Sequence, residues 1–145
     1  MIDGEYGHVR QLVIDRAPSA DDLILVSEGV LRHGRSLAEE GNAQPIACFL
    51  RQAGKVIAGA SGRTEYGRLF VSYLWVESAH RRQGLGTQVL QELERAALQD
   101  GCRDALIETL DDGFASMYQG LGYSLVAVVR KYVGTFNRHI LVKPL

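Results

Sequence analysis

The hydrophobic pattern of this chain changes its period at Gly84, and this change limits the fold more than any other feature. Before it, residues 45–52, 55–62 and 67–76 predict three consecutive strands, because they are strand-like runs separated by short turns that contain glycine. After it, apolar residues recur at helical spacing, at Leu85, Val89, Leu90, Leu93, Ala96 and Ala97. The succession predicts an antiparallel meander that leads into an amphipathic helix.

The residues after this helix predict a crossover and a closing hairpin. Residues 105–109 form a short apolar strand, and residues 113–119 form a second, shorter helix. Two strands follow at residues 123–132 and 136–142, joined near Gly134. A connection through the first helix makes two central strands parallel, so the chain is α+β with a mixed sheet rather than a regular alternation of strands and helices.

The N-terminal residues predict one more strand and a broken helix. Residues 8–15 mix apolar and polar positions in a strand-like way, and Ser19 is a candidate N-cap for the helix that follows. Residues 33–36, His-Gly-Arg-Ser, predict an interruption of this helix before a shorter polar segment that ends at Gly41. We expect residues 1–145 to form a single domain, because a chain of 145 residues holds one core and is too short for two.

Composition argues against several classes of partner. The formal net charge is −1, so no global positive field draws the chain onto nucleic acid or an anionic membrane. Its first residues lack the pattern of a signal peptide, and no run approaches about 18 apolar residues. Cys48 and Cys102 have no CxxC spacing and suit reduced packing positions. We therefore expect a cytoplasmic protein without nucleic-acid or membrane partners, and a homodimer stays open.

Residues 81–87, Arg-Arg-Gln-Gly-Leu-Gly-Thr, predict an anion site between a strand and a helix. The first N–H groups of a helix have no intrahelical acceptor, and glycines let phosphate oxygens approach the backbone. A diphosphate suits this arrangement. A Rossmann fingerprint needs a third glycine where Val89 stands, and a Walker loop needs Gly-Lys-Ser/Thr where only Gly86 and Thr87 stand, so both alternatives fail. The four histidines are scattered without ligand spacing, so we expect no metal site, at His8, His33, His80 and His139.

Two segments resemble the GNAT family of acetyl-CoA-dependent N-acetyltransferases. Leu-Trp-Val at residues 74–76, four residues, and then Arg-x-x-Gly-x-Gly at 81–86 is similar to the family's acetyl-CoA signature. Glu108 and Thr109 followed by residues 117–123 resemble its later motif of strand, short helix and Gly-Tyr. The resemblance covers about residues 44–145. It implies a mixed, mostly antiparallel sheet of six to seven strands flanked by about four helices.

The resemblance also implies roles for the residues of both motifs. Backbone groups of Leu74, Trp75 and Val76 would bind acetyl-CoA, with one N–H polarising the thioester carbonyl. The pyrophosphate would lie on the loop formed by Arg81, Arg82, Gln83, Gly84, Leu85, Gly86 and Thr87. The plain alternatives are a buried strand and a solvated basic turn. Tyr118 takes the family position of the general acid that protonates the CoA thiolate, and a structural tyrosine is the competing interpretation.

The general base and the acceptor are less defined by the sequence. Glu108 is the best-placed carboxylate for the base, against an ordinary charge at a strand end, and the lesser candidates are Glu28, Glu65 and His80. Gly113 and Phe114 depart from the Gln-Ala of one family branch, and Asp111 stands where the wider family often has asparagine, so these contacts are not carried over.

The reaction that the resemblance implies is direct transfer of acetyl from acetyl-CoA to a primary amine of a small molecule, without an acetyl-enzyme. The alternatives are an acyl-CoA sensor or interaction module on the same fold, and an acetyltransferase for protein N-termini or lysines. The acceptor itself cannot be derived from the motifs, because fold does not decide substrate.

Overall fold

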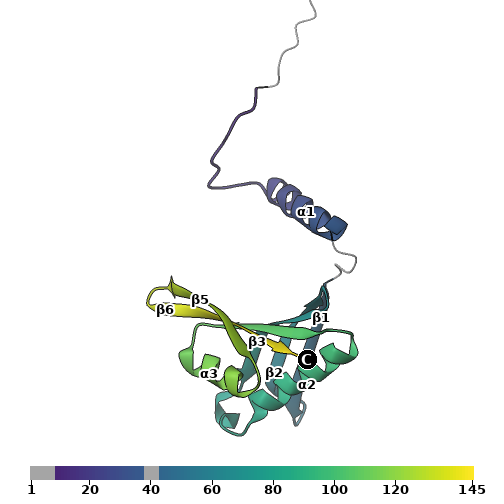
Figure 1. Cartoon of the computed structure of the whole chain (residues 1–145), viewed down its shortest axis with the longest axis vertical. Helices are drawn as coiled ribbons and strands as arrows, with labels where there is room; N and C mark the ends of the chain where they lie inside the picture. The colour runs from purple at the N-terminus through teal and green to yellow at the C-terminus, as the bar shows by residue number, and fades with distance from the viewer. Residues whose placement is uncertain (1–8, 38–42) are drawn as a thin grey trace, which may run out of the picture. The chain divides into compact units, whose positions relative to one another are not determined.

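The computed structural model describes residues 9–37 and 43–145, which fall into two units with a boundary after Leu37 (Figure 1). Within residues 9–37 the first unit contains one helix, α1 (Ala20–Leu37), and the second unit contains every strand that the structure describes. No helix in these two ranges is long and apolar enough to cross a membrane. Each unit is described by itself below.

Helix α1 begins at the predicted N-cap but is longer than predicted. The Ser19 hydroxyl accepts a hydrogen bond from the Asp22 N–H at 3.1 Å, which satisfies one of the free N–H groups of the first turn. The predicted interruption at residues 33–36 is wrong, because α1 continues to Leu37. A glycine such as Gly34 costs only about 1 kcal/mol relative to alanine inside a helix, which the rest of the helix offsets.

The strand predicted for residues 8–15 is also wrong where the structure describes it. Residues 9–15 have no regular secondary structure, and His8 lies outside the described residues. A strand is held by hydrogen bonds to a neighbouring strand, and residues 9–15 pair with none that the structure describes. An alternating pattern alone does not supply that partner.

The second unit is built on one six-stranded mixed sheet. Its strands are β1 (Gln44–Gln52), β2 (Lys55–Glu65), β3 (Arg68–Val76), β4 (Asp104–Thr109), β5 (Ser124–Val133) and β6 (Phe136–Pro144). They lie in the order β1-β2-β3-β4-β6-β5, and β3 and β4 form the parallel pair. This confirms the predicted meander, crossover and closing hairpin, and with them the α+β fold class.

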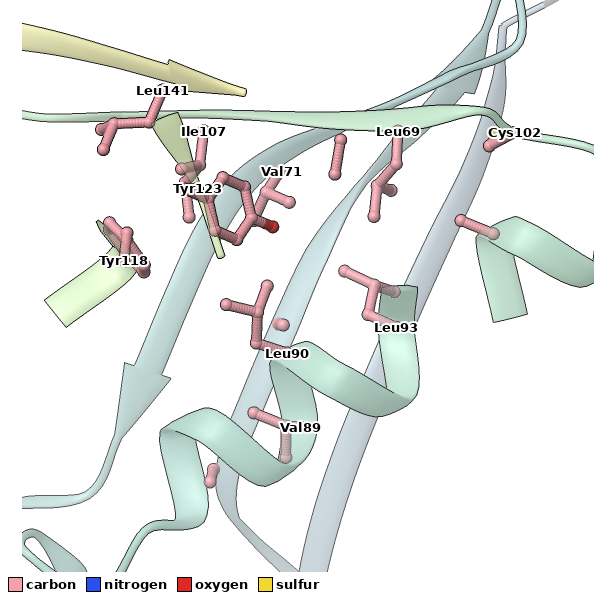
Figure 2. Packing of buried hydrophobic residues seen from close by; sticks show 14 residues of the cluster. Leu69, Val71, Val89, Leu90, Leu93, Cys102, Ile107, Tyr118, Tyr123 and Leu141 are labelled. Carbon is pink, nitrogen blue, oxygen red and sulfur yellow. The ribbon is translucent and has the colours of Figure 1, made fainter. Parts of the chain in front are cut away.

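Two helices complete the second unit, together with the short 3-10 turn η1 (Ser78–His80). Helix α2 (Leu85–Gln99) packs on β1, β2 and β3, and α3 (Asp112–Gly120) packs on β4, β5 and β6. Both contribute to one hydrophobic cluster, in which Val89, Leu90 and Leu93 of α2 point toward the strands (Figure 2). The described residues thus hold three α-helices rather than about four, since the first predicted helix is unbroken.

A β-bulge in β3 changes which side chains face the core. Ser61 of β2 lies opposite Tyr73 and Gly62 lies opposite Val71, so Ser72 is an extra residue without a partner in β2. A bulge of this kind bends the strand and shifts its alternation by one position. The bulge has two consequences for the site.

The first consequence is a change of face. Before the bulge Val71 faces the core, and after it Leu74 and Val76 do. Alternate residues of a strand point to opposite faces, so Tyr73 and Trp75 point away from that core. Both are exposed, at 76% and 49%.

The second consequence is that β3 and β4 separate. Their pairing runs from Arg68 opposite Asp104 to Val71 opposite Ile107 and ends there, although both strands continue. The last residues of β3 therefore have a neighbour on the β2 side and a gap on the β4 side. The site described next lies along this gap.

A buried polar cluster ties α2 to the C-terminal hairpin. Glu94 is 6% exposed, and its two carboxylate oxygens accept hydrogen bonds from the Tyr123 hydroxyl at 2.9 Å and from Lys143 Nζ at 2.7 Å. Burial and the neighbouring carboxylate raise the pKa of Tyr123 far above its usual value, so the phenol stays protonated. The Tyr123 ring lies 5.8 Å from the ring of Tyr118, so the cluster supports that side chain from behind.

Candidate active site

A cavity of about 1080 Å³ lies where β3 and β4 separate, and it collects nearly every predicted site residue. The predicted site residues that line the cavity are Leu74, Trp75, Val76, Arg81, Arg82, Gly84, Leu85, Gly86, Thr87, Glu108 and Tyr118. Gln83 belongs to the same loop but does not line the cavity. Residues from two distant motifs of the sequence therefore meet in one place.

One wall of the cavity is the free edge of β3 at residues 72–76. In an antiparallel pair, the N–H and C=O groups of every second residue point toward the partner strand, and those between point the other way. Because β4 has separated from β3 at this level, the outward groups meet the cavity instead of a strand. This edge can form hydrogen bonds with an extended ligand, as an additional strand would.

The start of α2 forms a second wall, and its backbone donors are free. Gly84 is the N-cap with φ of 75°, and no side chain caps the helix. The first intrahelical bond runs from Gln88 N to Gly84 O at 3.0 Å, so the N–H groups of Leu85, Gly86 and Thr87 have no intrahelical acceptor. Together with the helix dipole they form a local anion site.

The start of α3 differs from that of α2, because a side chain caps it. The Asp111 carboxylate accepts a hydrogen bond from the Phe114 N–H at 2.8 Å and caps the helix. The residue that departs from the family's asparagine is therefore a helix cap. Of the two helix starts at the cavity, only that of α2 has no side-chain cap.

The two arginines of the loop have different surroundings. Arg81 Nε donates a hydrogen bond to the Val76 carbonyl at 3.1 Å and so fastens the loop to the end of β3. Arg82 has a left-handed backbone, with φ of 62°, and its exposed side chain lines the cavity. The Arg82 side chain can therefore approach a phosphate, whereas the Arg81 side chain chiefly keeps the loop attached to the end of β3.

Two of the lesser base candidates each lie next to a side chain of opposite acid–base character. His80 lines the cavity, and its Nδ1 lies 2.9 Å from a carboxylate oxygen of Glu77. The hydrogen bond from Lys55 and the nearby His80 lower the pKa of Glu77. Glu65 pairs with Arg63 at 2.9 Å and does not line the cavity.

Tyr118 belongs to α3 and lines the cavity. It is only 5% exposed, and its ring stacks with that of Phe114 at 6.5 Å between centroids. Burial raises the pKa of Tyr118 above the usual value of a phenol. The side chain is therefore protonated at neutral pH, which is the state that a general acid requires.

Glu108 also lines the cavity, but its carboxylate already has a partner. Arg138 of β6 pairs with it, and the same guanidinium donates to the Tyr132 hydroxyl at 2.7 Å. A base at this position must act through its second oxygen or after Arg138 has moved. Glu28, the remaining candidate, belongs to α1 and is not part of the second unit.

Several lining residues were not predicted from the sequence. They are Ser72, Tyr73, Leu110 and Phe136, together with Thr109 and Met117, to which the second motif gave no role. Spacing offered a signal for Met117, which is one residue from Tyr118 and three from Phe114 on the same short helix. Phe136 had no such signal, because its place at the cavity depends on how the β5–β6 hairpin folds back. Within residues 9–37 and 43–145, no group of three His, Cys, Asp or Glu side chains could hold a metal ion.

Known proteins match both the sequence and the fold. The family model of the Acetyltransferase (GNAT) family matches residues 11–123. Blasticidin-S acetyltransferase of Streptomyces morookaense is 32% identical over 108 residues, which cover 71% of this chain and 79% of that protein. The crystal structure of an acetyltransferase from Bacillus cereus ATCC 14579 has a TM-score of 0.86 and 22% identity, covering 93% of this chain and 98% of that one.

A third match contains the cofactor. An aminoglycoside 6'-N-acetyltransferase complexed with coenzyme A has a TM-score of 0.62 and 20% identity, and covers 69% of this chain and 72% of that one. This fold therefore holds coenzyme A in a solved structure. With a family model that spans most of the chain and a relative above 30% identity, the chain belongs to the GNAT family of acetyl-CoA-dependent acetyltransferases.

Proposed function

We propose that this protein transfers the acetyl group of acetyl-CoA directly to a primary amine of a small molecule. The observation that carries the proposal is one cavity that holds three parts of such a reaction. These are the uncapped start of α2 for the pyrophosphate, the free edge of β3 for the pantetheine and thioester, and the protonated Tyr118 for the leaving thiolate. A relative named for acetylation of blasticidin-S supports a small-molecule acceptor.

The reaction that we propose passes through a tetrahedral intermediate. The amine nitrogen attacks the thioester carbonyl carbon, and an N–H from residues 74–76 stabilises the developing oxyanion. A donor of this kind contributes about 3 to 4 kcal/mol to transition-state stabilisation. When the intermediate collapses, the C–S bond breaks and Tyr118 gives its proton to the CoA sulfur. The Tyr118 phenolate then takes up a proton that the amine releases.

Neither cysteine suits a covalent acetyl-enzyme. Cys48 and Cys102 do not line the cavity, and burial raises the pKa of both thiols. A thiol with a raised pKa has less of the thiolate that acts as nucleophile. Direct transfer from the thioester to the amine is therefore the simpler path.

The amine needs to lose a proton before it attacks, because an alkylamine is mostly protonated at neutral pH. We propose Glu108 as the base, and because Arg138 pairs with its carboxylate, the proton must go to the second carboxylate oxygen or follow a movement of Arg138. Glu108→Gln separates the two roles. If Glu108 is the base, the variant loses one ionisation from the acidic limb of its kcat/KM profile, whereas loss of a structural ion pair lowers stability and leaves that ionisation in place.

The principal test of the proposal is Tyr118→Phe. We expect kcat to fall at least tenfold, while the dissociation constant of acetyl-CoA changes less than twofold, because the phenol acts on the leaving group and the ring is retained. Tyr66→Phe is the matched control, since Tyr66 lies in the turn between β2 and β3 and does not line the cavity. An unchanged kcat in Tyr118→Phe would remove Tyr118 from the mechanism.

The sensor and protein-acetylation alternatives predict different results with the same reagents. Titration calorimetry measures acetyl-CoA binding, and a thiol reagent measures release of free CoA with a panel of amines and peptides. Binding without CoA release across the panel identifies a sensor. Release with N-terminal or lysine peptides, but with no small amine, identifies a protein acetyltransferase.

A further inference from the structure

We propose that the acceptor is a primary amine joined to a flat ring, and that aromatic side chains on both sides of the cavity hold this ring. The inference rests on the proposed function and adds the chemical class of the acceptor. It begins with four aromatic residues that line the cavity and are largely exposed. Their exposed fractions are 76% for Tyr73, 49% for Trp75, 51% for Phe114 and 61% for Phe136.

The four rings come from opposite sides of the gap. Tyr73 and Trp75 belong to β3, and the bulge at Ser72 turns them away from the core that Leu74 and Val76 join. The two phenylalanines come from the other side, from the first turn of α3 and from the start of β6. A ligand in the cavity thus has aromatic side chains on both flanks.

These rings are not needed for the donor as proposed. Acetyl-CoA would use the backbone of residues 74–76 and the start of α2, which leaves the side chains of Tyr73 and Trp75 unassigned. Exposed aromatic side chains gathered at one cavity mark a surface that binds an apolar or aromatic partner. The acceptor is the remaining component of the reaction.

The charges of the cavity argue against an open-chain polyamine. The lining has two carboxylates, and each has a partner: Glu108 pairs with Arg138, and Asp111 caps α3. The lining also contains the guanidinium groups of Arg81 and Arg82. To bind an open-chain polyamine, the cavity would need carboxylates without a partner. To bind a flat ring, it needs exposed aromatic side chains, and these are what line it.

The test compares amines that differ only in the ring. Phenylpropylamine and cyclohexylpropylamine have the same chain and nearly the same ring size, and the amine is too far from the ring for its basicity to differ much. An aromatic ring against an aromatic side chain gains about two- to tenfold over a saturated one. We expect kcat/KM for phenylpropylamine to exceed that for cyclohexylpropylamine at least threefold, and that for diaminobutane by more.

Variants locate the preference at the rings. Phe136→Leu and Phe114→Leu keep apolar side chains and remove the flat surface, so we expect each to bring the ratio of the two kcat/KM values toward one while the KM for acetyl-CoA stays within twofold. Phe49→Leu is the control, because Phe49 is an exposed phenylalanine of β1 outside the cavity lining, and it should keep the ratio of the parent protein.

The outcomes distinguish this inference from the proposed function. Equal kcat/KM values for the two ring amines, or a preference for diaminobutane, overturn the ring proposal and leave amine acetylation in place. A threefold preference that survives in both phenylalanine variants overturns the assignment to these side chains. If no amine in the panel releases CoA while acetyl-CoA binds, both proposals fail.

Discussion

Replacing Gly62 with alanine tests whether the bulge shapes the cavity. A Cβ built on Gly62 would lie 2.0 Å from the Phe70 carbonyl oxygen and 3.1 Å from Val71 Cα. A carbon and a carbonyl oxygen in contact lie about 3.3 Å apart, so one of the two backbones must move by roughly 1.3 Å. Neither is the tip of a flexible side chain, so the movement falls on the paired strands at the bulge.

The expected cost follows from this overlap. Overpacking of a well-filled interior costs about 1 to 3 kcal/mol, and a clash with backbone belongs at the upper end. We therefore expect Gly62→Ala to lower the free energy of unfolding by about 3 kcal/mol, a large part of the roughly 5 to 15 kcal/mol of a typical domain. Because Tyr73 and Trp75 follow directly after the bulge in β3, kcat/KM should also fall about tenfold or more.

Urea denaturation gives the free energy of unfolding, and CoA release gives kcat/KM. Gly120→Ala is the matched control, since no atom beyond its chain neighbours and the nearby backbone of α3 lies within 4 Å of its added Cβ, and its φ is not positive. A glycine-to-alanine change in a compatible helix position is neutral or stabilises by up to about 1 kcal/mol. The reasoning is refuted if Gly62→Ala unfolds within about 0.5 kcal/mol of the parent protein and keeps its kcat/KM.

Two further predictions concern charge. Arg82→Asn removes the guanidinium, and asparagine tolerates the left-handed backbone, so the KM for acetyl-CoA should rise about tenfold with kcat nearly unchanged. Arg82→Lys keeps a positive charge and should keep most of the affinity. Equal KM values in the parent protein and both variants would exclude Arg82 from phosphate binding. The second concerns Asp104, whose pKa is lowered chiefly by its hydrogen bond from Arg68. A lowered folded pKa gives stability that is present above the ordinary carboxyl pKa and is lost as the pH falls below about 4. Between pH 7 and pH 3 the parent protein should therefore lose about 1 kcal/mol more than Asp104→Asn, and equal losses in urea denaturation would contradict the assignment.

The sequence predicted the second unit well because its signals are local. Turn glycines and a change of hydrophobic period mark the ends of β1 to β3 and the start of α2, and each predicted strand from residue 45 onward differs from the observed one by at most three residues at either end. The two errors, a strand at residues 8–15 and a helix break at residues 33–36, lie where the outcome depends on residues outside the local pattern. Residues 9–15 alternate without a strand to pair with, and Gly34 is a helix breaker only where the surrounding helix is weak.

The β-bulge in β3 could not be predicted from a single sequence. Gly62 suits many turns and strands, and only its register against Val71 shows that a side chain there would strike a carbonyl. Similarly, the Arg138 partner of Glu108 depends on the pairing of β4 with β6. Both facts are long-range, and both change the chemistry expected at the cavity.

This difference explains why the donor can be identified from the sequence and the acceptor cannot. Acetyl-CoA would be held mainly by backbone groups, at a free strand edge and an uncapped helix start, and backbone geometry requires particular residues such as Gly84 at φ of 75°. Those requirements appear as a motif. The acceptor would be held by side chains, and Tyr73, Phe114 and Phe136 meet only because a bulge, a short helix and a hairpin bring them to one cavity. A different set of side chains on the same backbone would keep the donor site and change the acceptor, so the acceptor must be determined from the cavity itself.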